Sequence, residues 1–321
     1  MPRALVVVSV LTLAIAGVAV AAIALGDSQE PIASLRPPRT TPAGTGVPAV
    51  CGRLRPTRTG RITSGEATEL SGLVVSRTRP GLLWTHNDSG DRARILAMRT
   101  GGAFAGSFDI PGAESIDAED IATGPRPGGG ALLYLADIGD NDAERASVVV
   151  WRVPEPSAAA APGGTTAPPR RIELRYPDGA QNAETLLVDP RRGDLAIVTK
   201  DFGGRSVLYT APASAGADGT VTTLRRAARI DFGFAGLATG GDISRSGSVI
   251  VVRTYGAAFA WTRRAGESIG AAMRRRPCRS HADLATEGQG EAIALTADGR
   301  GFYTVAEGRN PPIRLYSPAR R

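Results

Sequence analysis

This chain of 321 residues contains only two histidines, two cysteines and one lysine. Two cysteines so far apart, neither in a Cys-x-x-Cys pair, exclude the usual zinc sites and dithiol redox motifs. The chain also lacks a Gly-x-Ser-x-Gly nucleophile elbow and a Walker-type phosphate loop. His86 and Ser89 stand within one short turn, a spacing that disfavours a Ser/His catalytic pair. The familiar hydrolase and nucleotide-binding signatures are therefore absent.

Basic charge is concentrated near the N-terminus. The formal net charge is +7, but residues 1–61 hold seven arginines against two acidic residues, a net charge of +5. The remaining 260 residues therefore carry only +2, without the strong field that nucleic-acid binding needs. We expect no nucleic-acid partner.

Residues 4–25 form a run of 22 residues without a charge, preceded by Arg3. A membrane-spanning helix needs about 20 apolar residues, so residues 1–26 are predicted to be an N-terminal membrane anchor. The small residues between Val18 and Ala24 keep a cleaved signal peptide as an alternative, and a buried core helix is a third. Either membrane interpretation places the rest outside the cytoplasm, membrane-anchored or secreted. Residues 27–56, rich in Pro, Gly and Arg, are predicted to be a flexible tether.

Cys51 and Cys278 are the two cysteines. In an exported protein they are expected to form one disulfide, while two unpaired buried thiols are the alternative.

Five segments of residues 57–321 repeat one scheme: an acidic residue, a short apolar run, a Gly-containing turn and a second apolar run. Third runs such as "SVVVWRV" and more polar fourth runs such as "RIELRY" and, less clearly, "SIGAAMRR" follow. Four short strands per unit predict an all-β fold, a β-propeller with five repeats, and a β-sandwich is the alternative. A degenerate sixth blade stays open in residues 211–241 or 265–290. The repeats start at Glu69, Glu119, Glu184, Asp242 and Glu291.

The fifth repeat ends after its third strand, at "IRLYSP". Residues 57–63, "TRTGRIT", are predicted to supply the missing outer strand and so to close the ring. That pairing would also bring Cys51 towards Cys278.

The repeat starters are expected to meet at one mouth of the central channel, since the first strand of a propeller blade lines it. Converging like charges need compensation by a cation, by basic side chains or by protonation. An oxygen-rich set with little His or Cys favours Ca²⁺ over Mg²⁺ and zinc. The alternative is that these carboxylates bind backbone amides or arginines. The predicted metal ligands are Glu69, Asn87, Asp88, Glu119, Asp137, Glu184, Asp242 and Glu291, and the predicted ligand-binding residues are His86, Lys200 and Arg253.

Several segments resemble a group of exported actinobacterial propeller proteins that is similar to the phytase-like and esterase-like propeller superfamily. They are "ELSGLVVS", "LLWTHNDSGD", "DAEDIATGP", "LYLADIGDN" and "GQGEAIALTADG". The resemblance implies a propeller, usually six-bladed, and suggests Ca²⁺ ions at an acidic mouth where metal-bound water attacks a phosphate.

Two functions follow as hypotheses. The first is a monomeric, membrane-tethered binding or scaffold propeller at the cell envelope, taking an anionic small molecule or envelope component. The second is a Ca²⁺-dependent phosphoester or ester hydrolase of the phytase-like type.

Overall fold

The computed structural model describes residues 46–157 and 163–319. The predicted anchor and most of the predicted tether lie outside these residues. Within the two described ranges, no helix is long and apolar enough to cross a membrane. Residues Ala43–Arg321 form a compact unit of their own, to which the following description applies.

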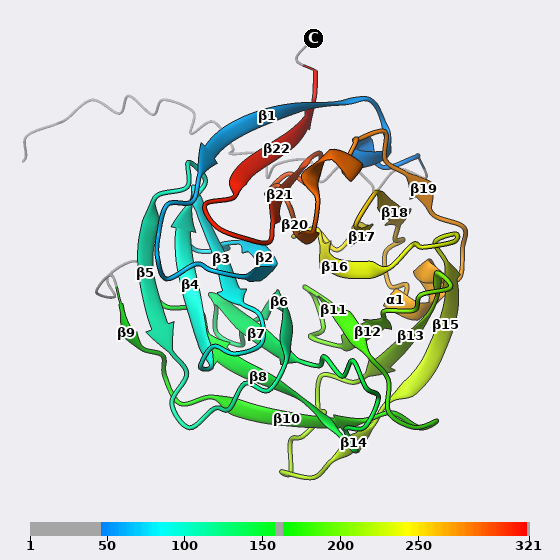
Figure 1. The fold of residues 1–321 in the computed structure, drawn as a ribbon. Coiled ribbons are helices and arrows are strands. Elements are labelled where there is room, and N and C mark those ends of the chain that lie inside the picture. Colours follow the sequence, from blue (N-terminus) through cyan, green and yellow to red (C-terminus); the bar gives the residue numbers. More distant parts are fainter. Residues whose placement is uncertain (1–45, 158–162, 320–321) are drawn as a thin grey trace, which may run out of the picture. The chain divides into compact units, whose positions relative to one another are not determined.

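The unit is a β-propeller of five blades arranged around a central axis (Figure 1). The all-β prediction and the count of five are confirmed, and the strands within the residues proposed for a sixth blade belong to blades 2 to 5. From the axis outward, blade 1 contains β2 (Leu70–Val75), β3 (Leu82–Asn87), β4 (Arg94–Arg99), β5 (Phe104–Asp109) and the short β9 (Gly164–Thr165). Blade 2 contains β6 (Ala118–Pro125), β7 (Ala131–Asp137), β8 (Val148–Pro154), β10 (Arg170–Arg175) and the short β14 (Thr222–Thr223).

The other three blades have four strands each. Blade 3 contains β11 (Ala183–Val188), β12 (Leu195–Thr199), β13 (Arg205–Ala211) and β15 (Arg225–Asp231). Blade 4 contains β16 (Ala238–Ile243), β17 (Val249–Thr254), β18 (Ala258–Thr262) and β19 (Cys278–Arg279), and blade 5 contains β20 (Gly290–Leu295), β21 (Phe302–Ala306), β22 (Pro312–Pro318) and β1 (Leu54–Arg61).

One predicted strand is a helix instead. The segment "SIGAAMRR" forms the short helix α1 (Ile269–Met273), which Ser268 caps by accepting a hydrogen bond from the Ala271 amide at 3.1 Å. Its apolar side chains fit a helical spacing and pack into the core between blades 3 and 4. The outer strand of blade 4 is therefore the two-residue β19. The described residues also contain two short 3-10 helices, Ala49–Cys51 and Ala285–Glu287.

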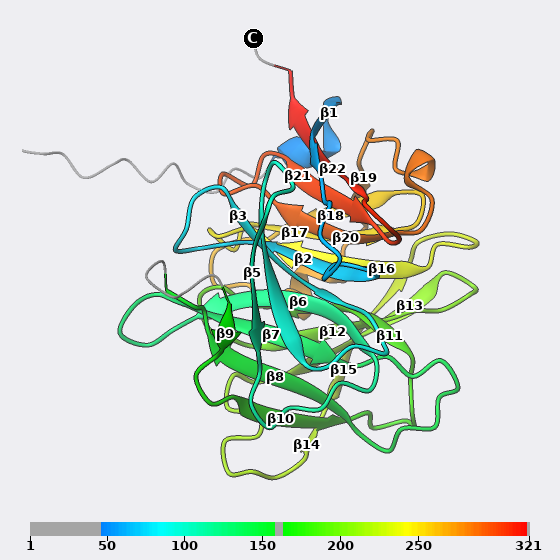
Figure 2. The ribbon, with the colours of Figure 1, turned by 60° about the vertical axis from the view of Figure 1, so that its left-hand side comes forward.

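The ring closes as predicted, with the N-terminal strand completing the last blade. β1 pairs antiparallel with β22 from Leu54 opposite Pro318 to Arg61 opposite Pro312, and the two strands lie side by side in both views (Figure 2). The strand begins at Leu54, three residues before the predicted Thr57. The Cys51–Cys278 disulfide is confirmed, with 6.0 Å between its Cα atoms. It joins the entry of blade 5 to the outer strand of blade 4.

Apolar packing between blades holds the ring together. Five buried clusters are present among the described residues, and each joins two neighbouring blades. The cluster that includes Leu73, Leu83, Ala292 and Val305 joins blade 1 to blade 5 and so completes the circle. Inner strands buried on both faces explain why their sequences are apolar runs without alternation.

The inner hairpins turn at glycines with positive φ. In blades 4 and 5 the turns contain Gly247 (φ 72°) and Gly299 (φ 67°), whose amides donate to Ser244 and Thr296 carbonyls at 2.7 and 2.8 Å. A left-handed backbone favours glycine, which explains the Gly in each repeat. The starts of neighbouring inner strands bind one another: the Ser71 hydroxyl donates to the Glu119 carbonyl at 2.6 Å and the Thr239 hydroxyl to the Gly290 carbonyl at 3.0 Å, so the strand starts meet at one mouth.

Candidate functional site

Each inner strand has a β-bulge near its start. In blade 2, Ala118 faces Asp137 and Asp120 faces Ala136, so Glu119 is the extra residue of the bulge. The same shift occurs in every blade. A bulge redirects a side chain out of the normal alternation, here at the mouth of the channel. The equivalent residues in blade order are Ser71, Glu119, Glu184, Thr239 and Glu291. The mouth ring therefore has three carboxylates and two hydroxyls.

Glu69 lies near this ring, and Asp242 does not. Glu69 precedes β2, and its carbonyl accepts a hydrogen bond from the Asp88 amide at 2.7 Å. Asp242 stands three residues after Thr239, about 10 Å further along β16 at about 3.3 Å per residue. Its carboxylate accepts hydrogen bonds from the Leu295 and Ile243 amides at 2.8 and 2.7 Å. The structure thus separates Asp242 from the other repeat starters, and it ties blade 4 to blade 5.

Asp120 makes a similar tie beneath the ring. Its carboxylate accepts hydrogen bonds from the amides of Leu186 at 2.8 Å and Gly241 at 3.3 Å, and from its own neighbour Ile121 at 2.8 Å. Burial raises the pKa of Asp120 well above its ordinary value despite these bonds. Blades 2, 3 and 4 therefore meet at one carboxylate directly below the mouth.

Lys200 and Tyr255 occupy one side of the mouth. The Lys200 ammonium group forms an ion pair with Glu184 and donates to the Tyr255 hydroxyl at 3.2 Å. Burial lowers the pKa of Lys200, but the Glu184 carboxylate outweighs it and raises the pKa above the ordinary value. Within the part of the chain that the structure describes, Oε2 of Glu184 and Oε2 of Glu291 are buried and have no hydrogen-bond partner. The mouth thus keeps unused oxygen ligands.

Asp88, Asp117 and Glu119 form a carboxylate cluster on the other side. One oxygen from each lies within 4.8 Å of the other two. Asp88 follows β3, whereas Asp117 and Glu119 flank the start of β6, so two blades contribute. Gly139 lies against this cluster, because a Cβ atom there would collide with the carboxylates of Asp117 and Glu119.

Repulsion within the cluster raises the affinity for protons. Burial, followed by the charges of Glu184 and Asp88, raises the pKa of Glu119 far above its ordinary value. Burial and the Asp88 charge raise the pKa of Asp117 to about 6, and burial also raises the pKa of Asp88. These three carboxyl groups therefore resist ionisation, and a cation bound between them would stabilise their charged form.

The loop "HNDSGD" places Asp88 through Asn87. Oδ1 of Asn87 accepts from the amides of Thr68 and Glu69 at 3.0 and 3.4 Å, and Nδ2 donates to the Glu66 carbonyl at 2.8 Å and to Asp91 at 2.6 Å. The Asn87 side chain, a predicted ligand, is therefore fully engaged in holding the loop.

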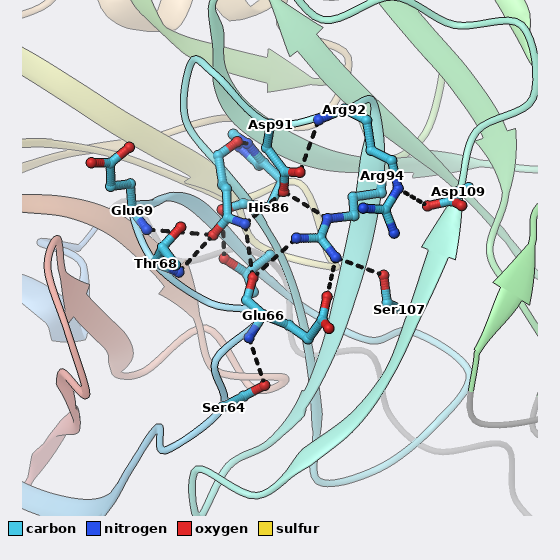
Figure 3. A network of polar contacts seen from close by, with 12 residues as sticks. Ser64, Glu66, Thr68, Glu69, His86, Asp91, Arg92, Arg94, Ser107 and Asp109 are labelled. Atoms are coloured by element: carbon cyan, nitrogen blue, oxygen red, sulfur yellow. Dashed lines mark hydrogen bonds and ion pairs between the residues drawn. The ribbon is translucent and has the colours of Figure 1, made fainter.

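Arg94 supports this loop from β4. Its guanidinium group binds Asp91 at 2.6 Å and also the Glu66 carboxylate (Figure 3). The Arg94 side chain is 8% exposed, whereas the Glu66 side chain is 50% exposed and that of Asp91 is 19% exposed, so the bond to Asp91 is the better shielded of these two charge-assisted bonds. The backbone around Asp88 is thus held from two strands of blade 1.

His86 lies behind the mouth, inside the blade 1 bulge. Its Nε2 accepts a hydrogen bond from the Gly72 amide at 3.1 Å, and its Nδ1 lies 2.8 Å from the Asn87 carbonyl oxygen, to which it donates. Burial lowers the pKa of His86 to about 4, so the ring is neutral at pH 7. Both ring nitrogens have backbone partners, which leaves no nitrogen for a ligand.

Asp137 and Arg253 are likewise committed to internal contacts. Asp137 accepts from the Asp117 amide at 2.9 Å and pairs with Arg145 at 2.9 Å, so it positions Asp117. Arg253 is fully buried, pairs with Glu287 at 3.2 Å and donates to the Ala292 carbonyl at 2.9 Å. It joins blades 4 and 5 rather than facing the mouth.

The structure brings together Glu69, Asp88, Glu119, Glu184, Lys200 and Glu291 of the predicted site. Sequence reasoning missed Asp117, Gly139 and the role of Tyr255. Asp117 immediately precedes β6 as Glu69 immediately precedes β2, so alignment of the repeats on strand starts could have found it. The role of Gly139 depends on a close approach between loops, for which the sequence has no signal.

Comparison with known proteins identifies no family. No family model and no curated protein matches the chain. Among solved structures, the chain is similar to XC5397 from Xanthomonas campestris, described as a gluconolactonase important in glucose secondary metabolic pathways. The identity is 14%, the TM-score is 0.46, and the match covers 87% of this chain and 99% of that chain.

Proposed function

We propose that the channel mouth binds a divalent cation, Ca²⁺, between Asp88, Asp117 and Glu119. The observation that carries the proposal is the convergence of three oxygens within 4.8 Å of one another. Two oxygens that both bind Ca²⁺ at about 2.4 Å are at most about 4.8 Å apart, so the cluster fits one ion. Ca²⁺ takes 6–8 oxygen ligands, which leaves positions for water and for oxygens of a bound molecule.

The absence of basic partners distinguishes this cluster from structural carboxylates. Buried Asp189 and Glu287 pair with Arg263 and Arg253, as expected for charges that only stabilise the fold. Within residues 46–157 and 163–319, no lysine or arginine forms an ion pair with a member of the cluster. A cation is the compensating charge that such a site requires.

A cation at this position supports a binding function. Lys200 and Tyr255 stand on the opposite side of the mouth, where they can bind an anionic or hydroxyl-rich group that also contacts the cation. We propose that the protein is an extracytoplasmic, membrane-tethered propeller whose mouth binds such an envelope component. Export is supported by the disulfide, which persists in oxidising compartments, and by the uncharged run at residues 4–25.

Calcium binding is tested by metal analysis and by thermal unfolding with CaCl₂ or EDTA. Saturation at about 100 times Kd adds about 2.7 kcal/mol of stability, so we expect the melting temperature to rise by about 5 °C or more. Asp117→Asn and Glu119→Gln should abolish the rise, whereas Asp142→Asn, an exposed control in the nearby loop, should keep it. Absence of both bound metal and a melting shift in the wild type would contradict the proposal.

A second candidate is Ca²⁺-dependent hydrolysis of a phosphoester or ester. The observation in its favour is that Lys200 lies at the same mouth as the carboxylate cluster, so that it supplies a positive charge in addition to the proposed Ca²⁺ ion. Two positive groups could stabilise the charge that develops on a reacting phosphate. The Ca²⁺-loaded protein is assayed with phytate, nucleotides and p-nitrophenyl esters. Turnover that Asp117→Asn abolishes would establish hydrolysis, whereas inactivity of the loaded wild type would leave the binding function.

A further inference from the structure

Eight exposed arginines line the outer edge of blades 3 and 4, far along the chain from the acidic mouth residues of blades 1 and 2. Three come from β15, one from the loop after β18, and four from the segment around the end of α1 and β19 (Figure 1). We call this surface the arginine edge. Its members are Arg225, Arg226, Arg229, Arg264, Arg274, Arg275, Arg276 and Arg279.

The arginine edge is one continuous surface. Three grooves adjoin along it, and neighbouring grooves share lining residues. The groove between β18 and the chain entry shares Arg275 and Arg276 with the groove beside Phe232, which in turn shares Arg274 with the groove between β15 and α1. A ligand with repeated negative charges can therefore contact the whole edge.

Most of these guanidinium groups have no acidic partner. Of the eight, Arg226 lies 3.7 Å from Asp178 and Arg275 pairs with Glu267; the described residues offer the other six no ion pair. The disulfide at Cys278 and the packing of α1 fix the backbone that presents them. Arginines without an acidic partner, presented on a fixed backbone, suit the binding of phosphate groups.

Charge is strongly segregated along the sequence that builds the propeller. Residues 225–279 contain eleven arginines and three acidic residues, a net charge of +8. Residues 46–321 together carry +6, so the residues outside 225–279 carry a net charge of −2. The net positive charge of the propeller therefore comes from the segment that builds the arginine edge.

The path of the chain favours a membrane as the partner. Gly46, the first described residue, lines the first groove of the edge, and its carbonyl accepts a hydrogen bond from Thr262 at 3.0 Å. The uncharged run ends at Leu25, so 20 residues separate it from the edge. Twenty residues span at most about 70 Å when fully extended. An anchor in the bilayer would thus hold the arginine edge within reach of the lipid headgroups at high effective concentration.

We propose that the arginine edge binds the surface of an anionic lipid bilayer and so orients the propeller on the membrane. The choice of a bilayer rests on the anchor of the proposed function, but the interaction itself needs neither the anchor nor calcium. Clustered Lys and Arg residues bind anionic headgroups electrostatically, and the attraction extends over about one Debye length. The acidic mouth lies on a different part of the ring and stays free for its ligand.

Vesicle co-sedimentation of residues 43–321 tests this proposal. This fragment is a compact unit with a complete ring and its own disulfide, and it lacks the apolar run that would insert into any bilayer. With EDTA present, we expect it to bind vesicles with about one-third phosphatidylglycerol at about 0.1 M NaCl, and not phosphatidylcholine vesicles. Binding should be lost at about 0.5 M NaCl, where the Debye length is near 4 Å.

Two charge-matched variants locate the surface. Replacing four unpaired arginines of the edge should weaken the partition onto anionic vesicles about tenfold or more. A control with the same change of charge on blades 2 and 5 should bind like the wild type. Circular dichroism and melting temperatures should show that both variants fold. The edge variant is R225Q/R229Q/R276Q/R279Q, and the control is R55Q/R58Q/R126Q/R300Q.

Three results would overturn the proposal. They are absence of binding to anionic vesicles, equal loss of binding in the two variants, and stronger binding to duplex DNA than to vesicles of equal phosphate concentration. The last result would assign the edge to nucleic acid. Failure of calcium binding would leave this experiment unaffected, because it is performed in EDTA.

Discussion

Most buried charges in this propeller are stabilised by an arginine or by backbone amides. The kind of partner separates structural residues from candidate functional residues. Arg253 and Arg263 each pair with a buried carboxylate, and removing one partner of such a pair costs about 3–5 kcal/mol. Asp120 and Asp242 are compensated by backbone amides of the next blade. Within the described residues, the carboxylate cluster at the mouth has no ion pair, and its one backbone partner is the Ser89 amide, which donates to Asp88 at 2.6 Å; this difference supports it as the candidate cation site.

Asp242 predicts a measurable dependence of stability on pH. Burial raises the pKa of Asp242 to about 7 in the folded state, partly offset by bonds to the Leu295 and Ile243 amides and by the charge of Arg77. The ordinary value is near 4, so the folded state retains a proton that the unfolded state loses between pH 4 and 7. Stability conferred by this group therefore decreases as the pH rises through that window.

Asp242→Asn tests this prediction. Chemical denaturation of both proteins between pH 4 and 8 should show that the wild type loses up to about 4 kcal/mol of unfolding free energy relative to the variant. Asparagine has one acceptor oxygen, so one of the two amide hydrogen bonds is lost in the variant, which lowers its stability by an amount independent of pH. Parallel pH profiles of the two proteins would refute the assignment.

The strand β1 and the helix α1 show where the sequence pattern predicted secondary structure correctly and where it did not. The outer strand β1 was predictable because the fifth repeat lacked a fourth strand and a strand-forming segment preceded the first repeat. The helix α1 was not, because in a five-residue segment the helical and extended apolar patterns are too short to distinguish. Its packing against blades 3 and 4 decided the outcome.

The disulfide between the entry of β1 and β19 should contribute substantially to stability. Cys51 and Cys278 are 227 residues apart, and a cross-link that closes so long a loop is worth about 5 kcal/mol in the chain-entropy model. Cys51→Ser combined with Cys278→Ser should lower the unfolding free energy by about that amount. Equilibrium denaturation measures the loss, and the reduced wild type should match the variant. Unchanged stability in both would show that the ring closes without the cross-link.

At the scale of the whole molecule, the ring brings residues from distant repeats to one mouth and keeps opposite charges apart. Glu119 and Glu291 are separated by most of the chain, yet both occupy the bulge position of an inner strand. The arginine edge is assembled from β15 and from the insertion that contains α1. Its proposed binding to anionic bilayers would therefore orient the propeller without engaging the mouth.

The sequence by itself determined the repeat number, the closing strand and the disulfide. These follow from local patterns, namely short apolar runs with glycine turns, an incomplete last repeat and only two cysteines. It also predicted most of the mouth carboxylates, because the repeat places Glu119, Glu184 and Glu291 at the same position along their inner strands.

Only the tertiary structure decided which of those polar residues face the mouth. The bulge position of β16 is occupied by Thr239, three residues before Asp242, so the acidic starters are not equivalent and Asp242 points elsewhere. His86, Asn87 and Arg253 satisfy backbone and side-chain partners that sequence proximity does not disclose. The arginine edge was hidden for a related reason, because net charge is a sum over the chain whereas binding depends on where the charges lie.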